Sequence, residues 1–289
     1  MMKDRYSIIT RISMKIIEGW ICHREQIPDD GHTFAPTNYI PFSTFMKFNY
    51  LGWLLPVVFL SCAGEPATLT STQLERTEGQ CPDACAEVHI SYPTVSAGSA
   101  ALTDSVQRWA NQVVRDYSVS MEEETTAAMS MEQAAAAFID LWKMEDHTVS
   151  YTFEVRDSVL ENTPDYVALQ LSGYIFSGGA HPNSFKELAV FETTSGKRIL
   201  PAAYIQDTQK ILPMLDIAYR AEKKEAFDNG FEYDGGQITF PVQVAFTEKG
   251  VLFHYNTYEI GPYVLGDASV FLTWTDLEGA AKHPFGVKK

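Results

Sequence analysis

The sequence has few cysteines and lacks the common motifs of catalysis and nucleotide binding. Four cysteines among 289 residues are too few for a disulfide-rich scaffold. No G-x-S-x-G, H-E-x-x-H, P-loop or G-x-G-x-x-G pattern occurs, and no histidines after residue 46 pair at metal-ligand spacing. The sequence therefore predicts no resident metal and no cofactor, and it favours a binding protein over an enzyme.

Basic residues are also scarce. The chain has 22 Lys and Arg against 37 Asp and Glu, a net charge of −15. Phosphates and acidic lipids gain nothing from meeting a negative protein, so we expect no nucleic acid among its partners. The content of hydrophobic residues, 45%, is ample for a packed core.

A short apolar run follows Lys47 and ends near Cys62. Residues 48–64 carry no charge, and the run is shorter than the ~20 residues of a membrane-spanning helix. Its end, FLSC, resembles the lipobox of bacterial lipoproteins, whose cysteine is lipid-modified and becomes the first residue. We predict a signal peptide at 46–61, lipid attachment to the membrane through Cys62, and removal or non-translation of 1–45. The alternative is a buried hydrophobic helix that happens to end in cysteine.

The remaining cysteines predict a local disulfide. Without Cys22 in the upstream segment and the lipidated Cys62, the pair Cys81 and Cys85 is left, and an export compartment favours its oxidation. A zinc site would need a second pair of ligands, and a redox motif would usually read C-x-x-C.

The mature chain divides by composition. Residues 62–87 are rich in Thr, Ser, Gly and charge without apolar periodicity, which predicts a flexible tether. A globular part would follow, with an N-terminal portion at 88–194, a C-terminal portion at 195–279 and a polar tail at 280–289.

Hydrophobic spacing indicates both helices and strands in the globular part. Helical spacing occurs over 102–117, over 130–142 behind a Ser130-x-x-Gln133 capping box, and over 207–228. Alternating or apolar runs predict strands at 88–92, 149–155, 167–175, 188–192, 238–246, 251–255 and 269–274. The turn residues NTPD at 162–165 predict an antiparallel hairpin between the second and third of these runs. Helices in blocks beside such strands predict an α+β fold of antiparallel sheets with helices on one face, and helix followed by sheet twice allows two subdomains.

Two loops carry the candidate ligand-binding residues. After one predicted strand, SGGAHPN places His181 and Asn183 on a tight glycine turn. After another, YNTYEIGPYVLG gathers Tyr258, Glu259 and Tyr263; tyrosine offers apolar area together with a hydroxyl for recognising sugar or protein. Both loops also allow purely structural readings: a sharp bend with a local histidine bond, and rings that plug the end of a sheet.

These two loops resemble the RsiV-like family of bacterial envelope domains. The resemblance rests on GGAHPN at 178–183 and LFHYNTYEIGPYVLGD at 252–267, in that order; Pro182 stands where the family often has Gly. It spans roughly 88–278, and the N-terminal part also resembles the domain that precedes the catalytic unit of PdaC-type peptidoglycan deacetylases. The resemblance implies an α+β module outside the cell membrane without established catalysis, which in RsiV binds lysozyme.

Three functions therefore remain in view. The first is a lipid-anchored binding or sensing module of the bacterial envelope, whose partner is a basic protein such as lysozyme or a peptidoglycan fragment. The second is an enzyme acting on cell-wall glycan, for which Glu259 is the candidate carboxylate. The third is a structural or assembly lipoprotein.

Overall fold

The computed structural model describes residues 65–118, 129–144, 149–233 and 235–286. The upstream stretch 1–45, the predicted signal peptide 46–61 and Cys62 lie outside the described residues. The described residues belong to one compact unit. Within its described part, no helix is long and apolar enough to cross a membrane.

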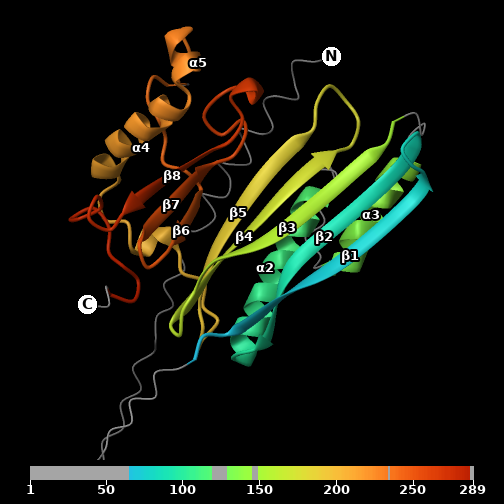
Figure 1. The fold of residues 1–289 in the computed structure, drawn as a ribbon, viewed down its shortest axis with the longest axis horizontal. Helices are drawn as coiled ribbons and strands as arrows, with labels where there is room; N and C mark the ends of the chain where they lie inside the picture. The colour runs from blue at the N-terminus through green and yellow to red at the C-terminus, as the bar shows by residue number, and fades with distance from the viewer. Residues whose placement is uncertain (1–64, 119–128, 145–148, 234, 287–289) are drawn as a thin grey trace, which may run out of the picture. The chain divides into compact units, whose positions relative to one another are not determined.

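The larger sheet has five strands, which lie in the order of the chain (Figure 1). Neighbouring strands run antiparallel, except that β2 and β3 run parallel and are joined by a crossover through two helices. The hairpin predicted around residues 162–165 is confirmed. The strands are β1 (Thr68–Gln80), β2 (Ala84–Ala97), β3 (Tyr151–Asn162), β4 (Tyr166–Phe176) and β5 (Asn183–Glu192).

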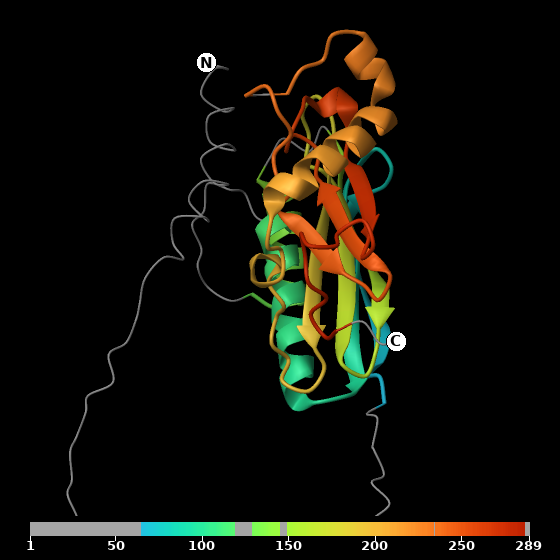
Figure 2. The same ribbon diagram turned by 90° about the vertical axis from the view of Figure 1, so that its left-hand side faces the viewer.

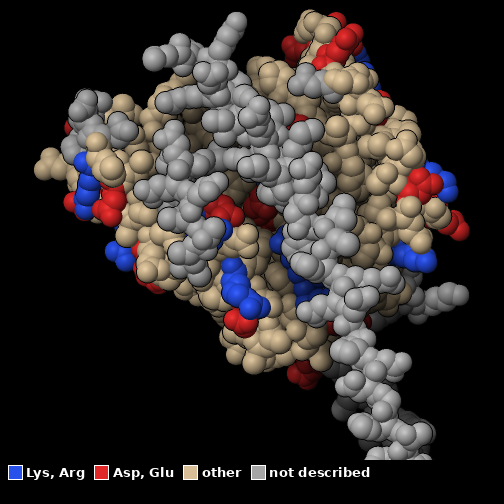
Figure 3. All heavy atoms as spheres, turned by 180° about the vertical axis from the view of Figure 1, so that it is seen from behind, with Lys and Arg blue, Asp and Glu red and all other residues tan. Residues whose placement is uncertain are grey.

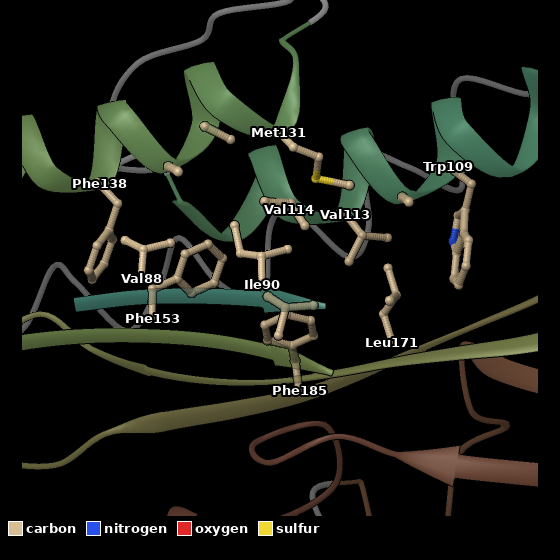
Figure 4. Packing of buried hydrophobic residues seen from close by; sticks show 14 of the residues in the cluster. Val88, Ile90, Trp109, Val113, Val114, Met131, Phe138, Phe153, Leu171 and Phe185 are labelled. Atoms are coloured by element: carbon tan, nitrogen blue, oxygen red, sulfur yellow. The ribbon is translucent and has the colours of Figure 1, made fainter. Parts of the chain in front are cut away.

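Helices α2 (Ala100–Ser118) and α3 (Met131–Lys143) cover one face of this sheet. The predicted capping box of α3 is present, with Ser130 Oγ accepting the Gln133 amide and the Gln133 side chain accepting the Ser130 amide. Figure 2 shows α2 lying along the sheet. The side chains that close the layer meet between helices and strands in Figure 4; they include Val113, Met131, Phe138, Val88, Phe153 and Leu171.

The prediction of a tether at 62–87 is wrong for most of that segment. Residues 68–80 form β1, the edge strand, which pairs along its length with β2. The segment looked like a linker because β1 is mostly exposed and only Leu69 and Leu74 pack against the core. The missed signal was threonine, which occurs four times in β1 and favours extended backbone. Cys81 and Cys85 form a disulfide across its turn.

A smaller sheet packs on the opposite face of β4 and β5. Its three antiparallel strands follow α4 (Thr208–Glu222) and α5 (Lys224–Asp228), and short 3-10 turns lie at Pro201–Ala203 and Tyr263–Leu265. Its core gathers Tyr166 and Leu188 of the large sheet with Ile211 and Tyr219 of α4. The strands are β6 (Gln243–Phe246), β7 (Gly250–Tyr255) and β8 (Ala268–Thr273).

The predicted α+β class is confirmed: the described residues hold eight strands in two mostly antiparallel sheets, with helices packed on them. The predicted polar tail is wrong for residues 280–286. Ala280 is buried, Ala281 forms a β-bridge with Ile205, and Phe285 stacks on Tyr166. Alanine and aromatic side chains in this stretch belong to the second core. The sequence did not indicate this because polar residues lie between them.

Candidate functional site

The loop after β4 carries His181 at the end of the sheet. Gly178 and Gly179 both have positive φ, 83° and 93°, a conformation that other residues rarely adopt. The exposed imidazole then turns back on its own chain, with Nδ1 3.0 Å from the Pro182 carbonyl oxygen. A carbonyl only accepts, so in the neutral ring Nδ1 carries the proton and Nε2 is an acceptor.

Asn256 fixes the second loop to the large sheet. Its Oδ1 accepts the Lys186 amide at 2.7 Å, and its Nδ2 donates to the Lys186 carbonyl at 3.1 Å. The side-chain amide thus pairs with the outer edge of β5 as a neighbouring strand would. This contact holds residues 256–266 beside the end of β5.

Glu259 supports the same loop from inside. Its Oε1 accepts the Val242 amide at 3.0 Å and its Oε2 accepts the Asn256 amide at 2.9 Å. Burial raises the pKa of this carboxyl, while the two amide bonds lower it. With both oxygens engaged by backbone, Glu259 closes a turn, as a structural residue would.

That turn holds Tyr258 in an unusual conformation. The Glu259 amide donates to the Asn256 carbonyl at 3.0 Å, and Tyr258 lies between them with φ of 72°. Positive φ costs a bulky residue on the order of 1–2 kcal/mol, and such strain persists where the surrounding structure enforces it. The strained residue is one of the predicted ligand-binding residues.

Three predicted residues come together and form what we call the aromatic platform: His181, Tyr258 and Tyr263. The rings of His181 and Tyr263 stack with centroids 3.8 Å apart, and the Tyr258 hydroxyl lies 3.0 Å from His181 Nε2. Tyr258 remains 37% exposed. Two loops, whose contacting residues His181 and Tyr258 are 77 residues apart in the chain, therefore build one partly open aromatic surface.

Asn183 makes a different contact. Its Oδ1 accepts the Ser184 amide at 3.0 Å at the start of β5, so its side chain serves the strand end. A hollow of about 130 Å³ opens beside Asn256. Its walls come from Ser172, Gly173, Ser184, Phe185, Lys186, Asn256 and Asp267.

His254 lies buried under the second loop, only 1% exposed. Its Nδ1 is 2.8 Å from Ser269 Oγ and its Nε2 is 3.1 Å from Asn256 Oδ1. Burial and the nearby Lys186 ammonium lower the pKa of His254 to about 4, so the ring is neutral at pH 7. Sequence reasoning missed this group; the available signal was a histidine inside an otherwise apolar strand.

Asp267 and Lys186 form the outer part of the same network. Lys186 Nζ lies 2.7 Å from Asp267 Oδ2, and this ion pair lowers the pKa of Asp267. Lys223, between α4 and α5, donates from its Nζ to the Asp267 carbonyl at 2.7 Å. This bond connects the end of α4 to the loop before β8. The network places charge next to the hollow.

Cys81, Cys85 and Glu87 offer three potential metal-ligand atoms within 4.8 Å of one another. The two sulfurs are bonded to each other, so they are not the thiolates that a zinc ion requires. On the visible part of the face in Figure 3, acidic and basic side chains lie in small mixed groups and form no single acidic field.

Comparison with known families divides the chain at the start of β5. Residues 80–184 match the model of the deacetylase PdaC, and residues 197–275 match a family of unknown function, DUF3298. The two matches cover separate, successive stretches of the chain. No curated protein matches it.

Solved structures show the same fold. A DUF3298 family protein from Bacteroides fragilis aligns with a TM-score of 0.59 and 16% identity, over 75% of this chain and 94% of its own. A DUF3298 family protein from Pseudomonas aeruginosa aligns with a TM-score of 0.58 and 16% identity, over 78% and 100%. The resemblance to RsiV stays a prediction.

The aromatic platform draws on both matches. His181 falls near the end of the PdaC match, whereas Tyr258 and Tyr263 fall within the DUF3298 match. Neither matched stretch contains all three residues. The platform therefore forms where the two matched stretches meet in the fold.

Proposed function

We propose that this protein is a binding module of the bacterial cell envelope that recognises the glycan of peptidoglycan through the aromatic platform. The observation that carries the proposal is the assembly of His181, Tyr258 and Tyr263 from two loops, with Tyr258 held at positive φ. Sugar rings present apolar C–H faces and hydroxyl edges. Stacked rings with hydroxyl and imidazole groups match both.

The hollow beside Asn256 adjoins both loops that carry the aromatic platform, since Ser184 in its wall follows the first loop and Asn256 begins the second. Ser172, Ser184 and Lys186 contribute hydroxyl and ammonium donors there. A sugar unit held on the rings would find groups for hydrogen bonding next to the apolar contact. Few, well-placed polar groups beside aromatic surface are the usual composition of small-ligand sites.

Calorimetric titration of the purified protein with soluble muropeptides tests the proposal. We expect binding to the wild type, and a loss on the order of tenfold for Tyr263→Ala because a stacking ring disappears. Tyr258→Phe keeps the ring but removes its hydroxyl, and should weaken binding less. Phe271→Ala removes an exposed aromatic ring on β8 and is the matched control, without expected effect. Absence of muropeptide binding by the wild type at micromolar protein would overturn the proposal.

Lysozyme is the second candidate ligand, and the net charge of −15 favours it because opposite charges accelerate encounter. The same titration with lysozyme separates the two. Binding that disappears at high salt and is unchanged in Tyr263→Ala would indicate an electrostatic protein partner and a different surface.

Catalysis on wall glycan is the third candidate, and it is suggested by the name of the deacetylase whose model matches residues 80–184. Glu259 is its nominated carboxylate, but both of its oxygens already accept backbone amides. Turnover of muropeptides by the wild type that vanishes in a folded Glu259→Gln variant would support an enzyme. Unchanged muropeptides would leave binding as the function.

The same proposal places the protein at a membrane through a lipid on Cys62, as the FLSC pattern indicates. Metabolic labelling with an alkyne fatty acid should mark the wild type and not Cys62→Ala. Mass spectrometry of the labelled protein should find its first residue at position 62. A labelled Cys62→Ala variant, or an unlabelled wild type, would contradict the anchor.

A further inference from the structure

The two sheets have four edges between them, formed by β1, β5, β6 and β8. The smaller sheet ends in β6, which has four residues, and in β8, which has six. Short edge strands present few unpaired backbone groups to another chain. The two edges of the smaller sheet are therefore poor sites for pairing with a further strand.

The outer edge of β5 is already occupied by the protein itself. Over residues 186–192, alternate residues all bond outward, either to side chains or to the backbone of 197–199. At Leu188, for example, the amide donates to Gln243 Oε1 and the carbonyl accepts a bond from Arg198 Nη2. No backbone edge is left on this side of the large sheet for a strand to join along its length.

The remaining edge, β1, is the longest of the four. Its thirteen residues pair with β2 on one side (Figure 1), and no strand lies on its other side in the part of the chain that the structure describes. It contains neither proline nor lysine, the residues that most often discourage pairing at a sheet edge. Its outer N–H and C=O groups therefore form a template for a further strand over roughly 43 Å.

This edge is fixed at both ends. Before it, the Asn162 side chain donates from Nδ2 to the carbonyl of Ala67 at 2.8 Å. After it, the disulfide between Cys81 and Cys85 closes the turn into β2. A strand that is held in place before it meets a partner loses little conformational entropy on pairing, which favours association.

The length of β1 indicates how two copies would pair. Two antiparallel copies are related by a two-fold axis perpendicular to the sheet, so each residue lies opposite one whose side chain is on the same face. An axis at Leu74 brings all thirteen residues, 68–80, into register. The side chain of Leu74 packs toward the helix-covered core, so the two copies of this residue would meet on the face that carries the helices.

Charge excludes the two nearest registers toward the end of the strand. An axis at Glu75 or at Arg76 would place that charge directly opposite its own copy, and like charges in this position are destabilising. With the axis at Leu74, Glu75 faces Gln73 of the second copy, and Arg76 faces Thr72. No charged residue of β1 then lies opposite a like charge.

We propose that two copies of this chain associate through β1, with their outer edges paired antiparallel about a two-fold axis at Leu74. The two five-stranded sheets would become one sheet of ten strands, joined by about a dozen backbone hydrogen bonds. The interface lies at the edge of the sheet opposite to β5, where Asn256 holds the platform loop. The proposal therefore does not depend on the function proposed for the aromatic platform.

Cysteine substitutions along β1 of the full chain test both the contact and its register. Leu74→Cys places two thiols on Cβ atoms about 5 Å apart, so mild oxidation should give a disulfide-linked dimer. Thr70→Cys and Glu78→Cys each lie roughly 26 Å from their own copies, and neither should cross-link alone. They lie opposite each other, so an equimolar mixture of the two variants should cross-link.

The wild type, which keeps the native cysteines, gives the background of this experiment. Cross-linking of Thr70→Cys alone to the level of Leu74→Cys would contradict the register. Absence of a dimer both from Leu74→Cys and from the mixture would overturn the proposal.

Charge at Gln73 tests the same interface without a covalent bond. This exposed residue faces Glu75 of the second copy, so Gln73→Glu should raise the dissociation constant of the dimer and Gln73→Lys should lower it. Two such pairs form, and each change should be about three- to tenfold in sedimentation equilibrium. Ile217→Lys adds the same charge to an exposed position on α4 and is the matched control, without expected effect.

Two results of the sedimentation series would contradict the interface. Equal changes for Gln73→Lys and Ile217→Lys would reduce the effect to net charge. A wild type that stays monomeric at high micromolar concentration would overturn the proposal and leave the edge of β1 to a strand of a different protein.

Discussion

The two sheets are held together in different ways. Within the five-stranded sheet, neighbouring strands bond through their backbones, as β1 and β2 do over their whole length. At the boundary with the smaller sheet, side chains take over this role. Asn256 pairs with the backbone of Lys186, and Gln243 Oε1 accepts the Leu188 amide at 2.9 Å.

A buried polar network continues along this boundary. Gln243 Nε2 donates to Glu187 Oε2 at 2.7 Å, and the Tyr117 hydroxyl donates to Glu187 Oε1 at 3.0 Å. Burial raises the pKa of Glu187. Arg198 Nη2 donates to the Leu188 carbonyl at 3.1 Å, and its burial lowers the pKa of the guanidinium.

This difference has a physical consequence. A backbone ladder has the same hydrogen bonds whatever the side chains are, so it tolerates substitution on its polar face. A boundary built from particular amides and titratable groups depends on each of them and on pH. The boundary is also what carries the aromatic platform, because Asn256 anchors its second loop.

The largest expected effect tests whether the two cores nevertheless unfold together. Phe153→Ala in the first core and Phe253→Ala in the second should each lower the free energy of unfolding by about 4 kcal/mol, since both rings are fully buried. Strands β4 and β5 contribute to both cores, so urea unfolding should show one transition. Separate transitions by fluorescence and circular dichroism in Phe253→Ala would mean that the smaller sheet unfolds alone.

The second prediction concerns pH at the boundary. The folded pKa of His254, about 4, lies below the ordinary value of 6.5. The unfolded chain therefore takes up this proton first, and stability present above pH 6.5 is lost as pH falls toward 4. The shift corresponds to at most about 3 kcal/mol. Urea unfolding at a series of pH values measures it.

His254→Gln is the control for that series, because it removes this titration. The raised pKa values of Glu187 and Glu259 act in the opposite direction, adding stability as pH falls, and both groups remain in the variant. The difference between the wild type and the variant should therefore change between pH 6.5 and 4. A difference that is constant over this range would contradict a buried neutral histidine.

The third prediction concerns Asn256, whose side chain pairs with the edge of β5 as a neighbouring strand would. Asn256→Ala should cost about 2 kcal/mol, because it leaves the edge of β5 at Lys186 and one nitrogen of His254 without this partner. Asn183→Ala removes an exposed amide nearby and should cost less than about 0.5 kcal/mol. Equal costs would show that solvent replaces Asn256 and that the boundary is no more fragile than the surface.

Sequence reasoning recovers the parts of this molecule that local rules govern. The α3 capping box, the hairpin at 162–165 and the alternation in β3 and β4 each depend on neighbouring residues. It also nominated His181, Tyr258 and Tyr263, which the fold brings together. The strand β1 was missed because its pairing partner supplies most of its stabilisation, and its own residues are polar.

Long-range contacts explain the rest. Nothing local in the sequence links Asn256 to Lys186, or Tyr166 to Phe285, because each pair lies more than 65 residues apart. Glu259 was nominated for chemistry, yet its partners Val242 and Asn256 give it a structural place that only the folded loop reveals. The partners of buried polar groups are therefore the contacts that are hardest to predict from the sequence.

The smallest expected effect is the reference against which the cost of Asn256→Ala is compared. Ser130→Ala removes the N-cap of α3, in the region held by backbone bonds, and should cost about 1 kcal/mol. The loss is small because Gln133 is exposed and water can reach its freed amide. Asn256 differs because its partner Lys186 is half-buried and its partner His254 is fully buried. Urea unfolding of both variants at pH 7 measures the two losses in the free energy of unfolding. Equal losses for Ser130→Ala and Asn256→Ala would show that the side-chain boundary is no more sensitive to substitution than the region held by backbone hydrogen bonds.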